Sequence, residues 1–277
     1  NDRLASEDAM RNAYVATFDT STPLLTASRG NHAVIRSFVE ATGDTALLWT
    51  LSAKDLRDVP MDVLTDHHSN APERASYLSV ELYDKYVRCP RVAGEMLTPY
   101  RRYFLDNIPA VQREQWRNSP QQLVKWVAQN IAIDEVRNPQ HLRMRPMGVW
   151  KHRTTDAVSR DILFVALART CGVAARIDGV TGKVQYMNEK CEWVDVAFGK
   201  DEAAQAQQGT LRAHYKAQPW LENPKYYIHF TVSALKDGFP SLLNYDDNDT
   251  YDNTFKQGQR LDTGAYVMIS GTRLASG

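Results

Sequence analysis

The chain has few of the residues that mark metal sites, disulfide frameworks or nucleic-acid surfaces. It holds only three cysteines in 277 residues, and their number and spacing suit neither a disulfide framework nor a zinc site. Lys plus Arg equals Asp plus Glu, 33 each, so the formal net charge is zero. That balance argues against nucleic-acid binding as the main role. No phosphate-cradling Gly-rich loop is present, and we expect neither a metal nor another cofactor.

Long apolar runs are also missing. No stretch approaches the length of a membrane span, and no signal peptide is evident. The chain opens with Asn-Asp-Arg rather than Met, so we interpret it as an excised piece of a longer protein that lacks the targeting information. Its length leaves room for a large core and for two domains.

The three cysteines are predicted to be unreactive. Cys171 ends an apolar helix and is typical of a small core residue. Cys191 lies in a turn before a strand, and Cys89 precedes a proline. A low, odd count fits a reducing compartment and a disulfide-free extracytoplasmic protein equally.

The most informative segment runs from Asp156 to Arg176. Every residue from 162 to 168 is apolar, which predicts a helix that is buried on all sides. Asp156 is a good N-cap, and Gly172 can take the left-handed geometry that ends helices. Residues 173–177 then predict a buried strand. A buried helix with an open N-terminus, followed by a strand, is one way in which proteins present a nucleophilic thiol.

Three motifs carry a resemblance. They are Arg169-Thr-Cys-Gly-Val-Ala-Ala-Arg176, Leu123-Val-Lys-Trp-Val-Ala-Gln-Asn-Ile-Ala-Ile-Asp134 and Pro146-Met-Gly-Val-Trp-Lys-His-Arg153. In this order and spacing they resemble the transglutaminase-like branch of the papain-like cysteine protease superfamily, over residues 122–198. The resemblance implies an α+β fold in which a buried central helix packs on an antiparallel sheet.

The nucleophile position of that family holds no cysteine. Counting back from Gly172, or forward from Arg153, leads to Ala157. If a two-residue deletion is allowed, Ser159 takes the position instead. The simplest interpretation of Ser159 is a residue in the first helical turn that bonds nearby backbone groups.

The family's base and acid are also replaced. The strand that would supply the histidine offers Lys183 or Gln185, and the next strand offers Asp195 or Ala197. No histidine occurs between residues 152 and 214. A neutral amide cannot act as a general base, whereas a desolvated lysine can.

Three functional hypotheses follow. The leading one is a catalytically inactive module that binds a peptide or a glycan, or supports assembly with other domains of the parent chain. The alternative is an amide hydrolase or acyl transferase with Ser159 as nucleophile, Lys183 as base and Asp195 as orienting acid. It requires the Ser159 hydroxyl within about 3 Å of the Lys183 amine. A third is an active site completed by His152 or His214.

We predict three regions: a helical extension over residues 1–118, the transglutaminase-like core over 119–205 and a β-sandwich-like domain over 206–277. Helices are expected within 5–18, 32–41, 58–66, 72–86 and after Pro99. Ser119-Pro-Gln-Gln122 predicts a helix that starts with a capping box. Residues 201–209 are the predicted linker. Strands are expected over 183–187, 192–196, 210–215, 226–232, 240–245 and 265–270, a set short enough that the last domain is truncated or leans on the first.

A narrower resemblance concerns multidomain bacterial proteins with a degenerate core of this kind followed by a β-domain. It is carried by Pro90-Arg-Val-Ala-Gly-Glu-Met-Leu97, by Ser159-Arg-Asp-Ile162 and by Gly271-Thr-Arg-Leu-Ala-Ser-Gly277. It implies an exported protein, located in the periplasm or at the cell surface.

Other candidate sites are weaker. The pair His67-His68 next to Asp66 lacks a third metal ligand, and adjacent helical side chains diverge. The acidic stretch 246–252 lacks the Gly and Glu of a helical calcium loop and is typical of a turn. Six aromatic residues are numerous enough to line a groove: Tyr100, Tyr103, Trp116, Trp150, Trp193 and Trp220.

Overall fold

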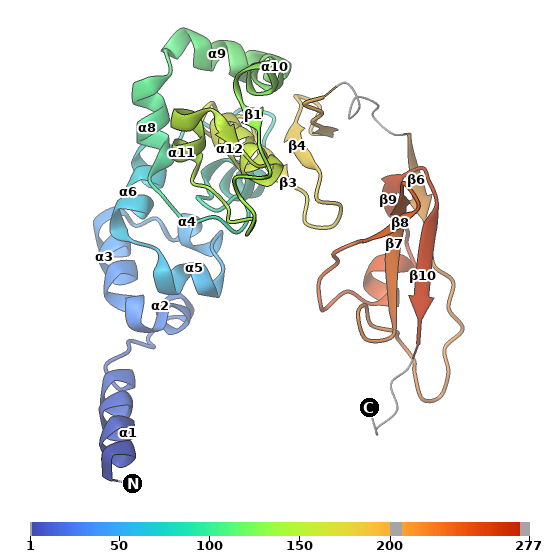
Figure 1. The fold of residues 1–277 in the computed structure, drawn as a ribbon. Helices are drawn as coiled ribbons and strands as arrows, with labels where there is room; N and C mark the ends of the chain where they lie inside the picture. Colours follow the sequence, from blue (N-terminus) through green and yellow to red (C-terminus); the bar gives the residue numbers. More distant parts are fainter. Residues whose placement is uncertain (1, 200–206, 272–277) are drawn as a thin grey trace. The chain divides into compact units, whose positions relative to one another are not determined.

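The computed structural model describes residues 2–199 and 207–271 (Figure 1). The chain forms two compact units: one combines residues 1–177 with 184–199, and the other combines 178–183 with 200–277. A helical N-terminal region precedes antiparallel, β-rich sheets. The expected α+β class is confirmed in this form. None of the helices in the described ranges is long and apolar enough to cross a membrane.

The first unit contains almost all the helices. They are α1 (Asp2–Val15), α2 (Pro23–Ser28), η1 (Arg29–Asn31), α3 (His32–Thr42), α4 (Thr45–Trp49), α5 (Ala53–Asp58), α6 (Met61–Ser69), α7 (Val80–Tyr83), η2 (Asp84–Arg88), α8 (Tyr100–Asn107), α9 (Ala110–Asn118), α10 (Pro120–Asn130), α11 (Pro146–His152) and α12 (Ala157–Thr170). The predicted stop of α3 is confirmed, because Gly43 has a φ of 68° that suits glycine.

Side-chain caps start several helices, but the predicted capping box before α10 does not form. Thr22, Asp44, Ser52, Ser79 and Asp156 each accept a backbone N–H in the first turn of their helix. The hydroxyl of Ser119 makes no such bond. Ser119 also closes α9, and its carbonyl oxygen, rather than its hydroxyl, accepts the N–H of Gln122 at 2.9 Å.

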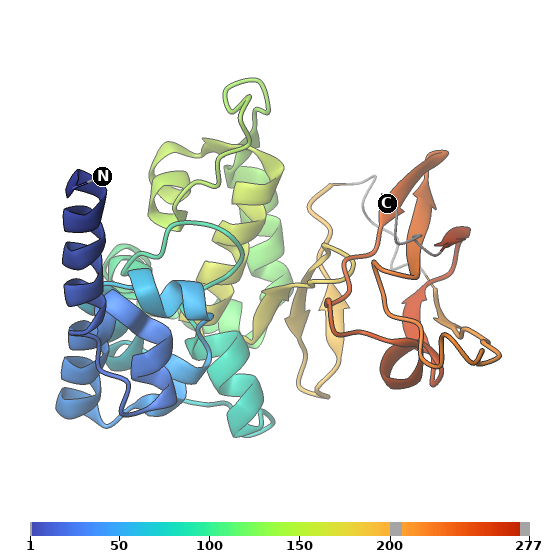
Figure 2. The ribbon, with the colours of Figure 1, turned by 90° about the horizontal axis from the view of Figure 1, so that it is seen from below.

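Helix α12 is the centre of the main core, as predicted. Its residues from 162 to 170 are all buried, and it contacts α8, α10, α11, β3 and β4. Figure 2 shows it running through the middle of the first unit. The helix ends at Cys171, and Gly172 follows with a φ of 87°. Tyr100, Phe104 and Trp116 of α8 and α9 belong to the same core, so this core draws on residues from 100 onward.

A three-stranded antiparallel sheet follows α12, with the strand order β3-β4-β5. The strands are β3 (Ala175–Ile177), β4 (Val184–Met187) and β5 (Trp193–Asp195). They lie within the stretches predicted as strands. A short parallel pair, β1 (Ala132–Ile133) with β2 (Thr154–Thr155), lies just before the helix. A second apolar core, separate from that of α12, is formed by residues 24–64 of the helical region with Cys89.

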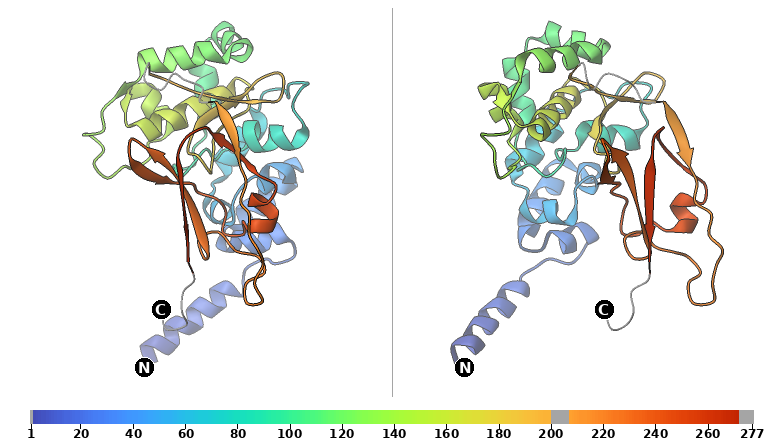
Figure 3. Two further views of the ribbon diagram at one scale, coloured as in Figure 1. Left: turned by 90° about the vertical axis from the view of Figure 1, so that its right-hand side faces the viewer. Right: turned by 45° about the vertical axis from the view of Figure 1, so that its right-hand side comes forward.

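The second unit is β-rich (orange to red in Figure 3). Its elements are β6 (Gln208–Leu211), β7 (Phe230–Lys236), β8 (Phe239–Leu242), η3 (Tyr251–Phe255), β9 (Gln259–Asp262) and β10 (Tyr266–Ser270). Strands β10, β7 and β8 form one antiparallel sheet, and β6 pairs with β9. The predicted linker falls partly outside the described residues, as does the terminal motif 271–277.

The strand predicted over 226–232 begins later, at Phe230, because Tyr226 has another role. The Tyr226 hydroxyl accepts the N–H of Val232 at 3.0 Å and donates to the carbonyl of Leu243 at 2.7 Å. Its ring stacks on Phe255 with centroids 5.6 Å apart. Tyr226 is therefore a buried anchor for the sheet.

Candidate functional site

The start of α12 is the predicted position of a nucleophile. Ala157 is the first residue of the helix, and its methyl group offers no chemistry. Its backbone N–H, which a helix leaves unpaired at this point, donates to the Glu135 carboxylate at 2.9 Å. A carboxylate at a helix N-terminus is favourable because it faces the positive end of the helix dipole. At the predicted nucleophile position, the structure therefore has a helix-capping contact between Ala157 and Glu135.

Ser159 is completely buried. Its hydroxyl donates to Asp156 Oδ2 at 2.7 Å and accepts the N–H of Met144 at 2.9 Å. A hydroxyl has one proton, and here Asp156 accepts it. These contacts connect the loop before α11 to the start of α12. The hydroxyl thus bonds a side-chain carboxylate and a distant N–H, rather than nearby backbone groups of its own helix.

Asp156 serves as the anchor of that connection. Burial alone would raise the pKa of Asp156, but hydrogen bonds from Ser159 and Asn138 outweigh it and lower the pKa. Asn138 donates to Asp156 Oδ2 at 2.8 Å. The carboxylate therefore stays charged and accepts several hydrogen bonds, as a good N-cap does.

The structure places the other predicted residues in two groups. Gln185 and Asp195 come together on adjacent strands, where the Gln185 amide donates to Asp195 Oδ1 at 2.7 Å. Lys183 belongs to the second unit, where its ammonium lies 2.5 Å from Asp262 Oδ2. Ser159 is in the first unit. Ala197 lies just past β5 and is half-buried.

Gln185 and Asp195 point away from α12. Side chains alternate between the faces of a sheet, and Val184, Tyr186 and Val194 pack into the same core as α12. The sheet therefore presents apolar side chains to the helix where a papain-like enzyme would need a base and an acid. Sequence spacing alone did not predict on which face these residues lie.

A row of three polar side chains crosses the opposite face of the sheet, and we call it the polar row: Arg176, Gln185 and Asp195. They are paired across β3, β4 and β5. Arg176 Nε donates to Gln185 Oε1 at 2.9 Å, so hydrogen bonds link all three. Gln185 is buried, whereas Arg176 and Asp195 are half-buried.

Two aromatic rings flank the polar row. The Arg176 guanidinium carbon lies 4.1 Å from the ring centroid of Trp193 and 5.6 Å from that of Tyr86. The two rings meet edge to face at 4.9 Å. Cation–π contacts of this kind fix a guanidinium in place. The polar row and its rings thus combine a cation, an amide, a carboxylate and flat apolar surface, without a nucleophile.

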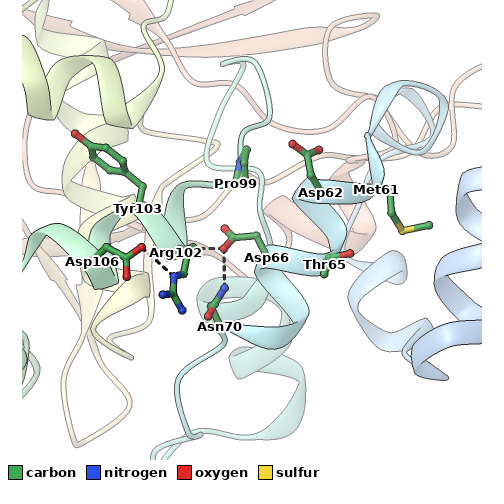
Figure 4. A pocket seen from close by; sticks show the side chains of 9 residues that line it. All are labelled: Met61, Asp62, Thr65, Asp66, Asn70, Pro99, Arg102, Tyr103 and Asp106. Carbon is green, nitrogen blue, oxygen red and sulfur yellow. Dashed lines mark hydrogen bonds and ion pairs between the residues drawn. The ribbon is translucent and has the colours of Figure 1, made fainter.

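A groove of about 690 Å³ lies between α6 and α8, where no sequence motif predicted a site. Figure 4 shows Asp66 at its centre. The Asp66 carboxylate accepts the backbone N–H groups of Arg101 and Arg102, both at 2.9 Å, and the Asn70 amide at 2.8 Å. Arg102 is paired with Asp106. Asp66 therefore caps α8, and the Asn70 and Arg102 side chains each pair with a carboxylate that lines the groove.

Asp66 and His67 both accept hydrogen bonds from Arg101, whereas His68 contacts Asp44. His67 is buried, and its Nδ1 accepts the Nε–H of Arg101 at 3.0 Å. Burial, together with the charges of Arg101 and Arg169, lowers the pKa of His67 well below its usual value. His68 Nδ1 lies 2.7 Å from Asp44 Oδ2. Within residues 2–199 and 207–271, no three His, Cys, Asp or Glu side chains group as metal ligands do.

Cys171 and three of the aromatic residues, Tyr100, Trp116 and Trp150, have structural roles, whereas Cys191 and Trp220 are exposed. Burial raises the pKa of Cys171 to about 12, so its thiol is inert at neutral pH. Tyr100 and Trp116 are buried, and Trp150 stacks on Trp126 at 4.8 Å. Tyr103 lines the groove between α6 and α8, and Trp193 flanks the polar row.

Comparison with known proteins identified no relative of this chain. No family model matches the chain, and neither a curated protein nor a solved structure is significantly similar to it. The transglutaminase-like resemblance stays a prediction from the residues.

Proposed function

We propose that this chain contains a noncatalytic transglutaminase-like core that binds a peptide or a glycan through the polar row and its flanking rings. The order of elements supports the relationship: a buried helix, α12, is followed by the antiparallel strands β3, β4 and β5. We propose further that the parent protein is exported and that other domains of that protein are partners of this module.

The observation that carries the proposed binding role is the composition of the polar row. Binding sites combine flat apolar surface with a few fixed polar groups. Trp193 and Tyr86 supply the surface on which a sugar ring or a peptide side chain packs. Asp195 and Arg176 supply an acceptor and a donor, held in place by Gln185.

The Ser159-dependent hydrolase or acyl transferase is the less favoured proposal. It needs a serine whose proton is taken by a base. The Ser159 hydroxyl instead donates to Asp156, inside the protein. The Asp156 carboxylate also accepts hydrogen bonds from the Asn138 amide and the Ser159 backbone N–H, so it serves as a helix cap rather than as a base.

The test is a binding screen with the whole chain, using arrays of glycans and of short peptides, followed by titration of the best ligand. We expect Trp193→Ala and Asp195→Asn to weaken binding about tenfold or more, the effect of losing about 1.4 kcal/mol. Trp220→Ala is the matched control, because Trp220 is 72% exposed and lies in the second unit.

Two outcomes would contradict the proposal. One is that no array member binds the chain. The other is that Trp220→Ala weakens binding as much as Trp193→Ala while both proteins stay folded by circular dichroism. Hydrolysis of a peptide or ester substrate that is lost in Ser159→Ala would instead support the enzyme.

A further inference from the structure

The segment from residue 136 to residue 155, which covers most of the loop between β1 and α11, helix α11 and strand β2, differs in charge from the rest of the chain. Residues 136–155 contain five Lys or Arg, two His and no Asp or Glu, although the chain as a whole is neutral. The remainder of the chain therefore carries a formal charge of −5. A local excess of one sign creates a field that attracts a partner of the opposite sign. The loop projects from the first unit in Figure 2 (yellow-green, top).

The five cations have different surroundings. Arg137 pairs with Asp134 at 2.9 Å, and Arg153 lies over the rings of Trp126 and Trp150. Arg143, Arg145 and Lys151 are exposed. In the part of the chain that the structure describes, these three form no ion pair with a carboxylate.

Arg143 and Arg145 contact a second loop, residues 91–97, and both contacts involve groups without charge. Arg145 Nη2 lies 2.6 Å from the sulfur of Met96. A Cβ at Gly94 would lie 2.9 Å from Arg143 Nη1, so the arginine packs directly on the glycine backbone. We call the exposed surface of Arg143, Arg145, Met96 and Leu142 the basic patch.

Apolar side chains are exposed in the same patch. Leu142 is 67% exposed and Met96 is 60% exposed. Arginine and methionine are enriched in protein–protein interfaces, because arginine gives directed hydrogen bonds and methionine adapts its shape. Exposed apolar residues beside arginines without carboxylate partners thus suggest a surface that a partner covers.

Both loops of the basic patch are fixed in shape. Asn138 accepts the N–H of Leu142 at 3.0 Å and donates to its carbonyl at 2.8 Å, while also bonding Asp156. In the other loop the Glu95 carboxylate accepts the N–H groups of Val92 and Ala93. A surface that is already ordered loses little conformational entropy when it binds.

From these observations we infer that the basic patch docks an acidic peptide segment of another protein, one that combines Glu or Asp with large apolar residues. Carboxylates of that segment pair with Arg143 and Arg145, which hold planar donor groups suited to bidentate contact. Its apolar residues cover Leu142 and Met96. This surface uses other residues than the polar row and does not depend on it.

Peptide is favoured over nucleic acid and membrane. Sequence-tolerant nucleic-acid binding uses exposed aromatic rings for base stacking, and the basic patch has none. Binding to anionic lipid uses clusters of about four to eight basic residues. In segment 136–155, three exposed basic residues are without a carboxylate partner in the described structure: Arg143, Arg145 and Lys151.

The experiment titrates the whole chain into a fluorescein-labelled peptide of repeating Glu-Glu-Leu units and follows fluorescence anisotropy. We expect saturable binding that weakens with added salt. Arg143→Glu with Arg145→Glu should weaken it about tenfold or more. Arg3→Glu with Arg11→Glu in α1 is the matched control: it changes the net charge equally at two exposed arginines and should have little effect.

Three further arms sharpen the test. Leu142→Ser with Met96→Ser should weaken binding of the Glu-Leu peptide, but not of an all-Glu peptide. Hydrogen exchange should show protection by the peptide within residues 91–97 and 134–145. If the charge-reversed protein loses its fold by circular dichroism, Arg143→Gln with Arg145→Gln replaces it.

The inference is overturned by any of three results. The first is no saturable binding by the wild type. The second is equal weakening in the α1 control. The third is preference for the competitors, a single-stranded oligonucleotide or vesicles with anionic lipid, over the peptide at equal charge concentration.

Discussion

The two faces of the β3–β5 sheet are formed by the same three strands, but one face is apolar and the other is polar. The face toward α12 presents Val184, Tyr186 and Val194 to the apolar core. The other face carries the polar row, and the rings of Trp193 and Tyr86 lie against its Arg176 end. One face thus packs on the main core, and the other holds a hydrogen-bonded row of polar groups. The comparison teaches that the two faces of one small sheet can differ fully in polarity, because side chains alternate between them.

The largest expected effect is on the α12 side. Phe164 is fully buried in α12, and Phe164→Ala should lower the free energy of unfolding by about 3–5 kcal/mol, because it removes apolar contacts and leaves a cavity. Urea unfolding followed by circular dichroism measures the change. A loss below about 1 kcal/mol would mean that α12 is not the centre of the core.

The second-largest effect is expected from acid, which should destabilise the fold around the buried His67. The pKa of His67 is lowered in the fold, so the unfolded chain binds a proton that the folded chain does not. Stability is therefore complete above about pH 6.5 and falls as the pH drops below it, by up to about 1.4 kcal/mol per pH unit. Protonated His67 could no longer accept the Nε–H of Arg101.

This prediction is measured by urea unfolding between pH 7.5 and 5, with His67→Asn as the variant that cannot titrate. The loss between pH 6.5 and 5 should be smaller in the variant, by at most about 1.6 kcal/mol. The same slope in both proteins would assign the acid sensitivity to other groups.

Ser159→Ala should have a moderate effect on stability and none on chemistry. It removes the hydroxyl that accepts the Met144 N–H, and leaving a buried N–H unpaired costs about 1–3 kcal/mol. Thermal unfolding measures the loss. A fluorophosphonate probe should label wild type and variant equally; labelling of the wild type alone would make Ser159 a nucleophile.

The smallest change in stability is expected on the polar side. Asp195→Asn keeps the shape and can still accept the hydrogen bond from Gln185, so we expect a loss below about 1 kcal/mol, with ligand binding strongly weakened. Leu163→Ala is the contrasting variant: it should cost several times more stability and leave the polar row intact. Equal costs on the two faces would remove the distinction between them.

Local signals predicted much of the fold. The apolar run 162–168, the Asp156 cap and Gly172 together specified α12, because each of these signals acts over a few residues. Strand β9 was missed because Gln259-Arg-Leu-Asp262 has little apolar character and forms only by pairing with β6. The hydroxyl of Ser119 fails as a cap because the same residue ends α9, which depends on both helices.

The candidate site was less predictable. Spacing placed Gln185 and Asp195 on neighbouring strands, and they do meet. Their face could not be predicted, because a shift of one residue turns every side chain of a strand to the other side. The groove between α6 and α8 joins residues within 61–70 to residues within 99–106, and no local sequence pattern predicts contact over that separation.

The alternation of side chains across β3–β5 limits which substitutions could introduce a catalytic thiol, base and acid at this site. Ala157→Cys would restore a thiol at the helix start, but that thiol would lie beside the Glu135 carboxylate, which opposes its ionisation. A base for it would have to replace Val184 or Tyr186, and an acid Val194, each in the apolar core. No single substitution would build such a site, because each step would bury a polar group without a partner. In the noncatalytic module that we propose, core packing therefore opposes the appearance of a thiol-based site.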